Sequence, residues 1–101
     1  MIISGGVNIY PREVEEILYK HPAISEASVV GIPDEHWGEV VKAVVVLRQG
    51  AVATDEELIK FCGKHLAGYK KPKSVDFWKE LPKSPQGKIL KKEIRAAYKK
   101  N

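Results

Sequence analysis

The sequence predicts an α+β fold: a small, mostly antiparallel three-stranded sheet with helices packed on it, in the order β-α-β-β-α-β-α. Residues 27–32 and 40–48 are rich in β-branched side chains, which favour strands. The loop of residues 33–39 between them is too short for a parallel crossover, so the two strands should be antiparallel. Thr54 and Glu57 have the spacing of a capping box, which predicts the start of a helix. At 101 residues the chain is long enough for one domain.

The N-terminal segment predicts an extended piece followed by a helix. Residues 2–9 form the extended piece and lead to Pro11, whose fixed φ suits the first position of a helix. Val14 and Leu18 then fall on one face of that helix, as expected for side chains that pack on a sheet.

The C-terminal half predicts a helix, a strand and a final helix. Cys62 lies on the apolar side of the helix that the capping box opens, where we expect a buried thiol. A single cysteine excludes an internal disulfide and suits a reducing compartment, so we expect a cytoplasmic protein. Residues 74–78 predict the third strand, and residues 89–100 predict a basic helix with Ile94 and Ala97 facing inward.

The net charge of +4 conceals a strong polarity along the chain. Residues 1–59 carry four Lys/Arg and ten Asp/Glu, whereas residues 60–101 carry thirteen Lys/Arg and three Asp/Glu. The basic half suits a polyanion: nucleotide phosphates, coenzyme A, a nucleic acid or an acidic partner domain. Composition does not choose among these. No apolar run approaches the length of a membrane span, so we expect no membrane partner.

The segment 82–88, Pro-Lys-Ser-Pro-Gln-Gly-Lys, predicts a rigid turn that ends in a lysine. Its two prolines fix their own φ angles and restrict the residues before them. Gly87 permits a positive φ or a close approach of the backbone to a ligand. Lys88 is therefore a candidate cation aimed at an anion, and the alternative is a plain surface turn in a lysine-rich tail.

Two further groups are candidates for ligand binding. The run Ser4, Gly5 and Gly6 predicts a tight loop whose backbone can meet a ligand without a Cβ in the way, although a plain turn is also possible. In the second group, Trp37 lies in the loop between two strands, where it could stack on a base. The residues around Pro72 add an aromatic ring and cations suited to phosphates: Tyr69, Lys71 and Lys73. The alternative for this group is a tryptophan that covers the core and a solvated basic loop.

Together, two segments resemble the C-terminal domain of the adenylate-forming enzymes, which include acyl-CoA synthetases, aryl-CoA ligases, adenylation domains of peptide synthetases and luciferases. Residues 4–15 resemble the family's Gly-Gly-x-Asn-Ile-x-Pro-x-Glu-Val-Glu segment, and residues 82–88 resemble its Pro-x-x-x-x-Gly-Lys segment. The resemblance covers nearly the whole chain in register and is greatest to acyl- and aryl-CoA ligases.

The resemblance implies a mobile lid that serves two reactions in turn. Lys88 would be the catalytic lysine of acyl-adenylate formation, with Gly87 beside it. After a rotation of the domain, Ser4, Gly5 and Gly6 would line the channel for the pantetheine arm of coenzyme A, and Trp37, Tyr69, Lys71 and Lys73 would meet its nucleotide end. The implied substrates are ATP, coenzyme A and a carboxylic acid. The implied partner is an N-terminal nucleotide-binding domain of the same polypeptide, which would also bind Mg²⁺.

Two alternatives stay open at this point. An adenylation-domain lid that serves a carrier protein would have no need of the basic residues for coenzyme A phosphates. A free-standing basic module that binds nucleic acid would use the positive half, but no recognisable nucleic-acid motif is present and the Gly-Gly segment would be unexplained. The three histidines lack the spacing of metal ligands, so we expect no metal site in this chain.

Overall fold

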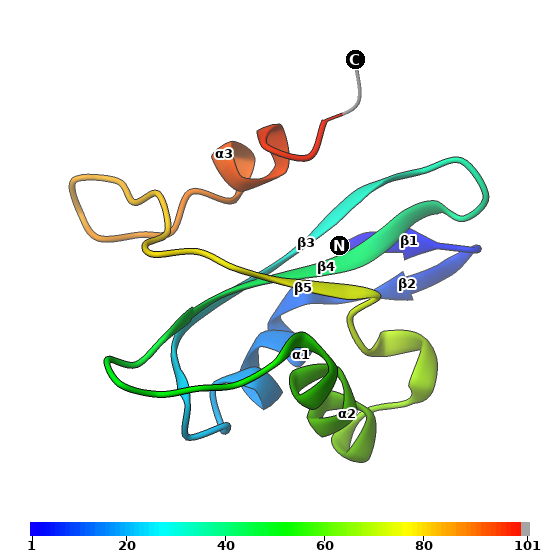
Figure 1. Ribbon diagram of the computed structural model, residues 1–101. Helices are drawn as coiled ribbons and strands as arrows, with labels where there is room; N and C mark the ends of the chain where they lie inside the picture. Colours follow the sequence, from blue (N-terminus) through cyan, green and yellow to red (C-terminus); the bar gives the residue numbers. More distant parts are fainter. Residues whose placement is uncertain (100–101) are drawn as a thin grey trace.

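The chain folds as a single five-stranded sheet with helices on both faces (Figure 1). The computed structural model describes residues 1–99. The elements are β1 (Ile2–Ser4), β2 (Val7–Ile9), α1 (Pro11–Leu18), β3 (Ile24–Asp34), β4 (Gly38–Leu47), α2 (Asp55–His65), the 3-10 turn η1 (Gly68–Lys70), β5 (Ser74–Phe77) and α3 (Lys91–Ala96). The strand order is β2-β1-β4-β3, with β5 paired to β4. The predicted α+β class is confirmed.

The sheet has five strands, whereas the sequence predicted three. The predicted extended piece is a hairpin, in which β1 pairs with β2 from Ile2 opposite Ile9 to Ser4 opposite Val7. Gly5 and Gly6 form its two-residue turn with φ values of 56° and 82°. Positive φ at both central positions is the geometry that matches the twist of a tight hairpin, and glycine adopts it without strain.

The predicted antiparallel pair is the longest part of the sheet. β3 and β4 pair from Ile24 opposite Leu47 to Asp34 opposite Gly38, with one irregularity near the start of β3. β5 lies parallel to β4, and this is the one parallel pair among the described strands. The crossover from β4 to β5 contains α2, which provides the length that a parallel connection needs.

Two apolar clusters fill the two faces of the sheet. α1 and α2 cover one face, and α3 lies on the other (Figure 1). The first cluster includes Val14 and Leu18 of α1 together with Leu58 and Cys62 of α2. The second is smaller and consists of Val30, Val44, Leu81 and Ile94, with partly buried residues around it. The sheet is therefore buried from both sides along β3 and β4.

The predicted helix signals are mostly confirmed. Pro11 begins α1, and the Thr54 side chain accepts a hydrogen bond from the Glu57 backbone N–H at the start of α2, at 3.1 Å. Burial raises the pKa of Cys62 to about 11, as expected for an inert core thiol. The final helix is shorter than predicted: it spans Lys91–Ala96, and Ile94 is buried but Ala97 is exposed. The end of the predicted helix, at residue 100, lies outside the described residues.

Among the described residues, no helix has both the length and the apolar character required to cross a bilayer.

Candidate ligand groove and lysine hairpin

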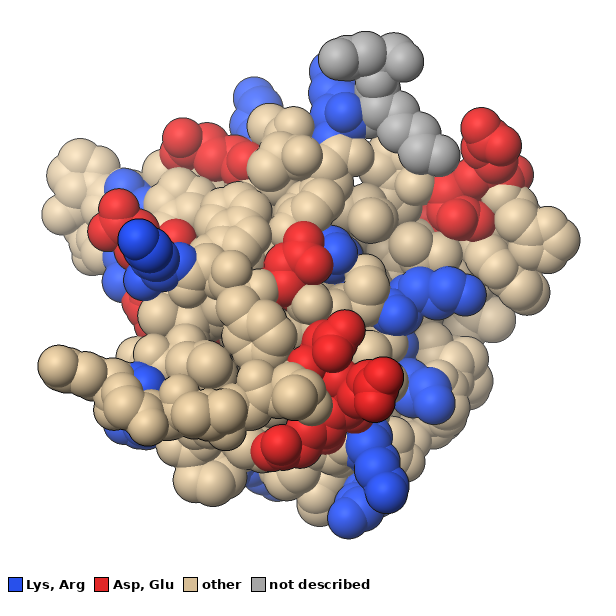
Figure 2. Space-filling view, in the orientation of Figure 1, with Lys and Arg blue, Asp and Glu red and all other residues tan. Residues whose placement is uncertain are grey.

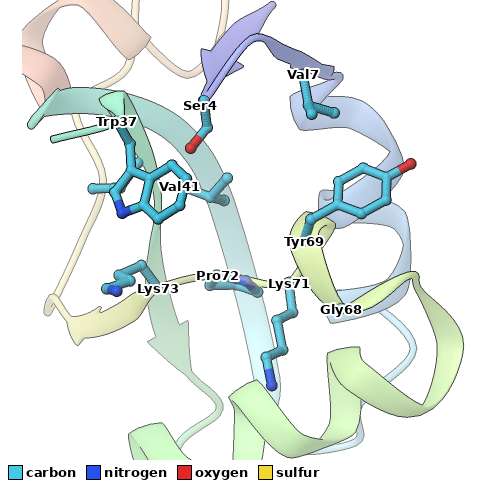
Figure 3. Close-up of a pocket in the computed structure, with 11 residues that line it drawn as sticks. Ser4, Val7, Trp37, Val41, Gly68, Tyr69, Lys71, Pro72 and Lys73 are labelled. Atoms are coloured by element: carbon cyan, nitrogen blue, oxygen red, sulfur yellow. The ribbon is translucent and has the colours of Figure 1, made fainter.

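Six of the residues predicted to bind a ligand line one groove of about 320 Å³ (Figure 3). They come from three separate parts of the chain: Ser4, Gly5, Trp37, Tyr69, Lys71 and Lys73. The remaining lining is largely apolar and consists of Val7, Val40, Val41, Gly68 and Pro72. The fold thus brings together the glycine turn, the β3–β4 loop and the segment before β5.

The glycine turn and the tryptophan form one wall of the groove. The Gly5 backbone N–H donates to the Trp37 carbonyl at 2.9 Å, which joins the β1–β2 turn to the β3–β4 loop. The Trp37 ring lies against Gly5, and a Cβ at this glycine would be 2.6 Å from Trp37 Cε3. Gly5 is therefore required for its positive φ and for the close approach of the ring. A Cβ at Gly6 would meet nothing within 4 Å, so the tip of the turn is open.

The position of Trp37 is fixed by the loop that carries it. One Asp34 carboxylate oxygen accepts from the backbone N–H groups of His36 and Trp37, at 3.0 and 2.8 Å. The His36 ring packs edge-on against the indole with centroids 4.6 Å apart. Trp37 is still 47% exposed, so it presents a broad apolar surface to the groove and is not part of the core.

The segment of residues 67–73 forms the opposite side of the groove. Figure 3 shows the Tyr69 ring across the groove from Trp37, with Pro72 and Val41 between them. The Lys73 backbone N–H donates to the Val41 carbonyl at 2.8 Å, which attaches this segment to β4. The ammonium groups of Lys71 and Lys73 lie on the side of the groove away from Ser4 (Figure 3).

Lys70, which the sequence analysis did not select, holds this segment from behind. Its Nζ pairs with Glu13 at 3.0 Å, and the hydrogen bond to that carboxylate raises the pKa of Lys70. The pair joins the groove to the start of α1. Glu13 and Lys70 are 57 residues apart in the sequence, and no local sequence pattern predicts an ion pair at that separation.

The groove can accept a narrow ligand with a charged end. Its apolar floor and two aromatic walls suit an extended chain, and the lysines at its rim suit anionic groups such as phosphates. No group of three or more His, Cys, Asp and Glu side chains among residues 1–99 is placed to hold a metal ion.

Lys88 lies outside this groove, on a separate hairpin of residues 82–90, the Lys88 hairpin. The Gly87 N–H donates to the Ser84 carbonyl and the Ser84 N–H donates to the Lys88 carbonyl, both at 2.8 Å. Gly87 has φ of 85°, the left-handed conformation that closes a three-residue hairpin loop. Lys88 is exposed, and within the described part of the chain its ammonium has no hydrogen-bond or ion-pair partner. The predicted rigid turn with a projecting cation is therefore present.

The two candidate regions lie at opposite ends of the molecule. In Figure 1 the Lys88 hairpin, in yellow and orange, is at one end of the sheet, and the β1–β2 turn, in blue, is at the other. Of the predicted site residues, Gly6, Gly87 and Lys88 do not line the groove. Gly6 is at the tip of the turn beside it, whereas the other two belong to the distant hairpin.

The charge polarity of the sequence is partly neutralised inside the fold. Three lysines of the basic half pair with glutamates of the acidic half: Lys70 with Glu13, Lys83 with Glu26 and Lys91 with Glu15. On the face seen in Figure 2, acidic and basic side chains are interspersed, and neither kind covers the face alone. This arrangement disfavours a continuous polyanion-binding surface on that face.

Comparison with known proteins agrees with this geometry. Residues 13–88 match the AMP-binding enzyme C-terminal domain. The chain belongs to this family. A long-chain-fatty-acid–CoA ligase of Bacillus subtilis is 57% identical over 94 residues, which are 93% of this chain and 17% of that protein. A feruloyl-CoA synthase from an Amycolatopsis species is 52% identical over 98 residues, 97% of this chain and 20% of that protein.

A solved relative has the same fold as this AMP-binding enzyme C-terminal domain. The structure of a Mycobacterium tuberculosis fatty acyl CoA synthetase superposes with a TM-score of 0.91 at 47% identity, over 97% of this chain and 19% of that chain. The AMP-binding enzyme C-terminal domain described here thus spans about a fifth of the length of the relatives it matches.

Proposed function

We propose that this chain is the C-terminal lid of an ATP-dependent acid–CoA ligase and serves two successive reactions with two different faces. The relatives that support the proposal are named as a long-chain-fatty-acid–CoA ligase and a feruloyl-CoA synthase. The partner in this proposal is an N-terminal domain of the same polypeptide, which binds the nucleotide, the carboxylic acid and Mg²⁺. We also assign the protein to the cytoplasm, in keeping with its free, buried cysteine.

A single observation carries the proposal: one rigid fold holds a projecting lysine at one end and a ligand groove at the other. Adenylate formation at the α-phosphorus and thioester formation at the acyl carbon need different groups in the same active site. A domain with two separated faces can supply them in turn by rotating about a hinge. The separation of the Lys88 hairpin from the groove supports this use.

In the first reaction Lys88 provides positive charge. The carboxylate of the acid attacks the α-phosphorus of ATP and expels pyrophosphate, so two anions must approach each other. A lysine ammonium between a phosphate oxygen and the carboxylate offsets this repulsion and stabilises the charge that develops in the transition state. The exposed hairpin with its unpaired ammonium suits this role because the group is free to enter another domain's site.

In the second reaction the groove receives coenzyme A. The thiol attacks the acyl carbon of the adenylate, and AMP leaves as the C–O bond breaks. The pantetheine arm would pass the glycine turn, where no side chain obstructs the backbone. The nucleotide end would meet Trp37, Tyr69, Lys71 and Lys73. Two exposed lysines at the rim favour free coenzyme A over a carrier protein as the acceptor.

Separate assays of the two half-reactions in the full-length ligase test the proposal. We expect Lys88→Ala to slow adenylate formation, measured as ATP–pyrophosphate exchange, on the order of 10²–10³-fold, as for loss of a preorganised charge. It should leave thioester formation from a supplied acyl-adenylate unchanged. Gly6→Val should show the opposite pattern, because a side chain at the open tip would block the approach of the thiol arm.

Gly50→Val is the matched control for Gly6→Val. Both glycines have positive φ, 79° and 82°, and neither has a neighbour within 4 Å of an added Cβ. The strain of the substitution is therefore shared, but Gly50 is not near the groove. Loss of both half-reactions in every variant would contradict the two-face proposal.

A further inference from the structure

The Lys88 hairpin is stiff, so the position of its tip follows the position of its base. The Leu90 N–H donates to the Pro82 carbonyl at 2.9 Å, and Lys83 forms a β-bridge with Ile89. Nearer the tip, the Lys88 N–H donates to the Ser84 hydroxyl at 3.2 Å. With hydrogen bonds along its length, the hairpin moves as one piece when its base moves.

Contacts of two kinds hold this base on the rest of the domain. At the incoming end, where the chain enters the hairpin, Leu81 is 4% exposed and packs with Val30, Val44 and Ile94. At the outgoing end, Lys91, the first residue of α3, donates to Glu15 Oε2 at 2.5 Å and to the Val29 carbonyl at 3.1 Å. The apolar contact restrains distance, whereas the ionic contacts have a defined direction: Lys91 pairs with Glu15 at the outgoing end, and Lys83 on the hairpin itself pairs with Glu26 of β3.

Glu15 is the centre of the ionic contact. Its side chain is 17% exposed, and the same carboxylate oxygen that pairs with Lys91 also accepts from the Val29 backbone N–H at 2.8 Å. One carboxylate therefore joins α1, the edge of β3 and the start of α3. The same carboxylate links the Lys88 hairpin to α1, the helix that directly follows the β1–β2 hairpin and its glycine turn.

We infer that Glu15 is a positioning residue for Lys88: through Lys91 it sets the direction in which the Lys88 hairpin projects from the domain. This inference rests on the catalytic role proposed for Lys88. Without the carboxylate, Lys91 keeps one neutral acceptor, the Val29 carbonyl, and the outgoing end of the hairpin loses its ionic restraint. A displacement of about 1 Å at a reacting group can lower a rate on the order of 10²-fold.

The experiment compares Glu15→Gln with Glu16→Gln in the full-length ligase. Glutamine keeps the length of the side chain and an oxygen for the Val29 N–H, but it cannot pair ionically with Lys91. Glu16, the matched control, pairs with Arg12 in a pair that is largely exposed. We expect Glu15→Gln to lower kcat for ATP–pyrophosphate exchange about 10- to 100-fold with little change in KM for ATP. Thioester formation from supplied acyl-adenylate should stay within about twofold of the parent, and Glu16→Gln should leave both rates unchanged.

Lys91→Gln provides a second route to the same test if Glu15→Gln folds poorly. It removes the ion pair from the other side and should show the same split between half-reactions. The double variant should be no slower than the slower single variant, because both changes remove one interaction.

The possible results separate this inference from the proposed function. If Glu15→Gln lowers both half-reactions equally, or lowers only the melting temperature, Glu15 is a structural residue and the inference is wrong. If Lys88→Ala leaves pyrophosphate exchange intact, the proposed function fails and the inference fails with it. If Lys88→Ala abolishes exchange but Glu15→Gln does not slow it, the inference alone is overturned.

Discussion

At the scale of single residues, the two glycines of the β1–β2 turn have different requirements. Both have positive φ, but only Gly5 has a neighbour that an added Cβ would strike. The sequence marked both as a loop that a ligand approaches. The structure shows that the first glycine accommodates the Trp37 ring, whereas the second leaves the tip open.

We expect Gly5→Ala to destabilise the domain more than Gly6→Ala. A left-handed backbone costs alanine about 1–2 kcal/mol at either site, and Gly5→Ala adds the overlap with Trp37. The free energy of unfolding, from urea denaturation of the domain, measures the difference. In a Trp37→Ala background the two substitutions should cost the same. A persistent difference there would show that the ring is not the cause.

At the scale of the elements, a polar network attaches the C-terminal helix to the sheet. The Tyr98 hydroxyl, just after α3, donates to Asp76 on β5 at 2.6 Å and accepts from the Trp78 indole N–H at 3.2 Å. Lys42 on β4 pairs with the same aspartate at 3.0 Å. Burial and the hydrogen bond to Asp76 raise the pKa of Tyr98 to about 12, so the phenol stays protonated at neutral pH.

Removing the Tyr98 hydroxyl should loosen this attachment. We expect Tyr98→Phe to lower the free energy of unfolding by about 1–2 kcal/mol, since it leaves two part-buried partners without their hydrogen bond. Tyr10→Phe is the control, because Tyr10 is largely exposed and its hydroxyl bonds no described residue. Equal stability of both variants would contradict the role of the network.

The same network gives a pH dependence. Burial acts to raise the pKa of Asp76, but the hydrogen bonds from Tyr98 and Lys42 outweigh it, so the net pKa lies below the ordinary 3.8. The stabilisation from this carboxylate is therefore full above pH 3.8 and is lost as pH falls through the folded-state pKa. As the pH falls below 3.8, the free energy of unfolding should decrease less for Tyr98→Phe than for the parent, because the variant has already lost one of the bonds that stabilise the Asp76 carboxylate. Acid denaturation of both proteins measures this difference.

Element order and type were largely predictable, but pairing at a distance was not. Local signals gave Pro11 at the start of α1 and the Thr54 cap of α2, because proline geometry and capping act within a few residues. The Gly5-Gly6 hairpin was missed because its two strands have only three residues each. Contacts such as Glu15 with Lys91 join residues 76 apart, and no periodicity reports such a pair.

At the scale of the whole molecule, the domain has apolar clusters on both faces of its sheet and a groove lined by three separate segments. The β1–β2 turn, the β3–β4 loop and residues 68–73 meet in one groove. This juxtaposition follows from the order of the strands in the sheet and not from the spacing of the segments in the sequence. The sequence provided the residue types, and the resemblance to adenylate-forming enzymes provided their shared role.

We expect the isolated 101-residue chain to fold cooperatively and to have no ligase activity. Its two apolar clusters lie on both faces of the sheet, so the core is closed without a partner. In contrast, the role proposed for Lys88 requires a nucleotide that another domain binds. Circular dichroism should show a single thermal transition. An ATP- and coenzyme A-dependent thioester assay should give no turnover above the blank, and measurable turnover would refute the expectation.

The bonds that Glu15 and Lys91 make to Val29 also protect the domain from self-association. β3 is an edge strand of eleven residues, and an unpaired edge of that length can recruit a strand from another molecule. At Val29 the outward N–H and carbonyl are already occupied by a carboxylate and an ammonium. An incoming strand would have to displace a charge pair at the middle of the edge. The rotation proposed for this domain could thus expose the strand to solvent repeatedly without seeding aggregates.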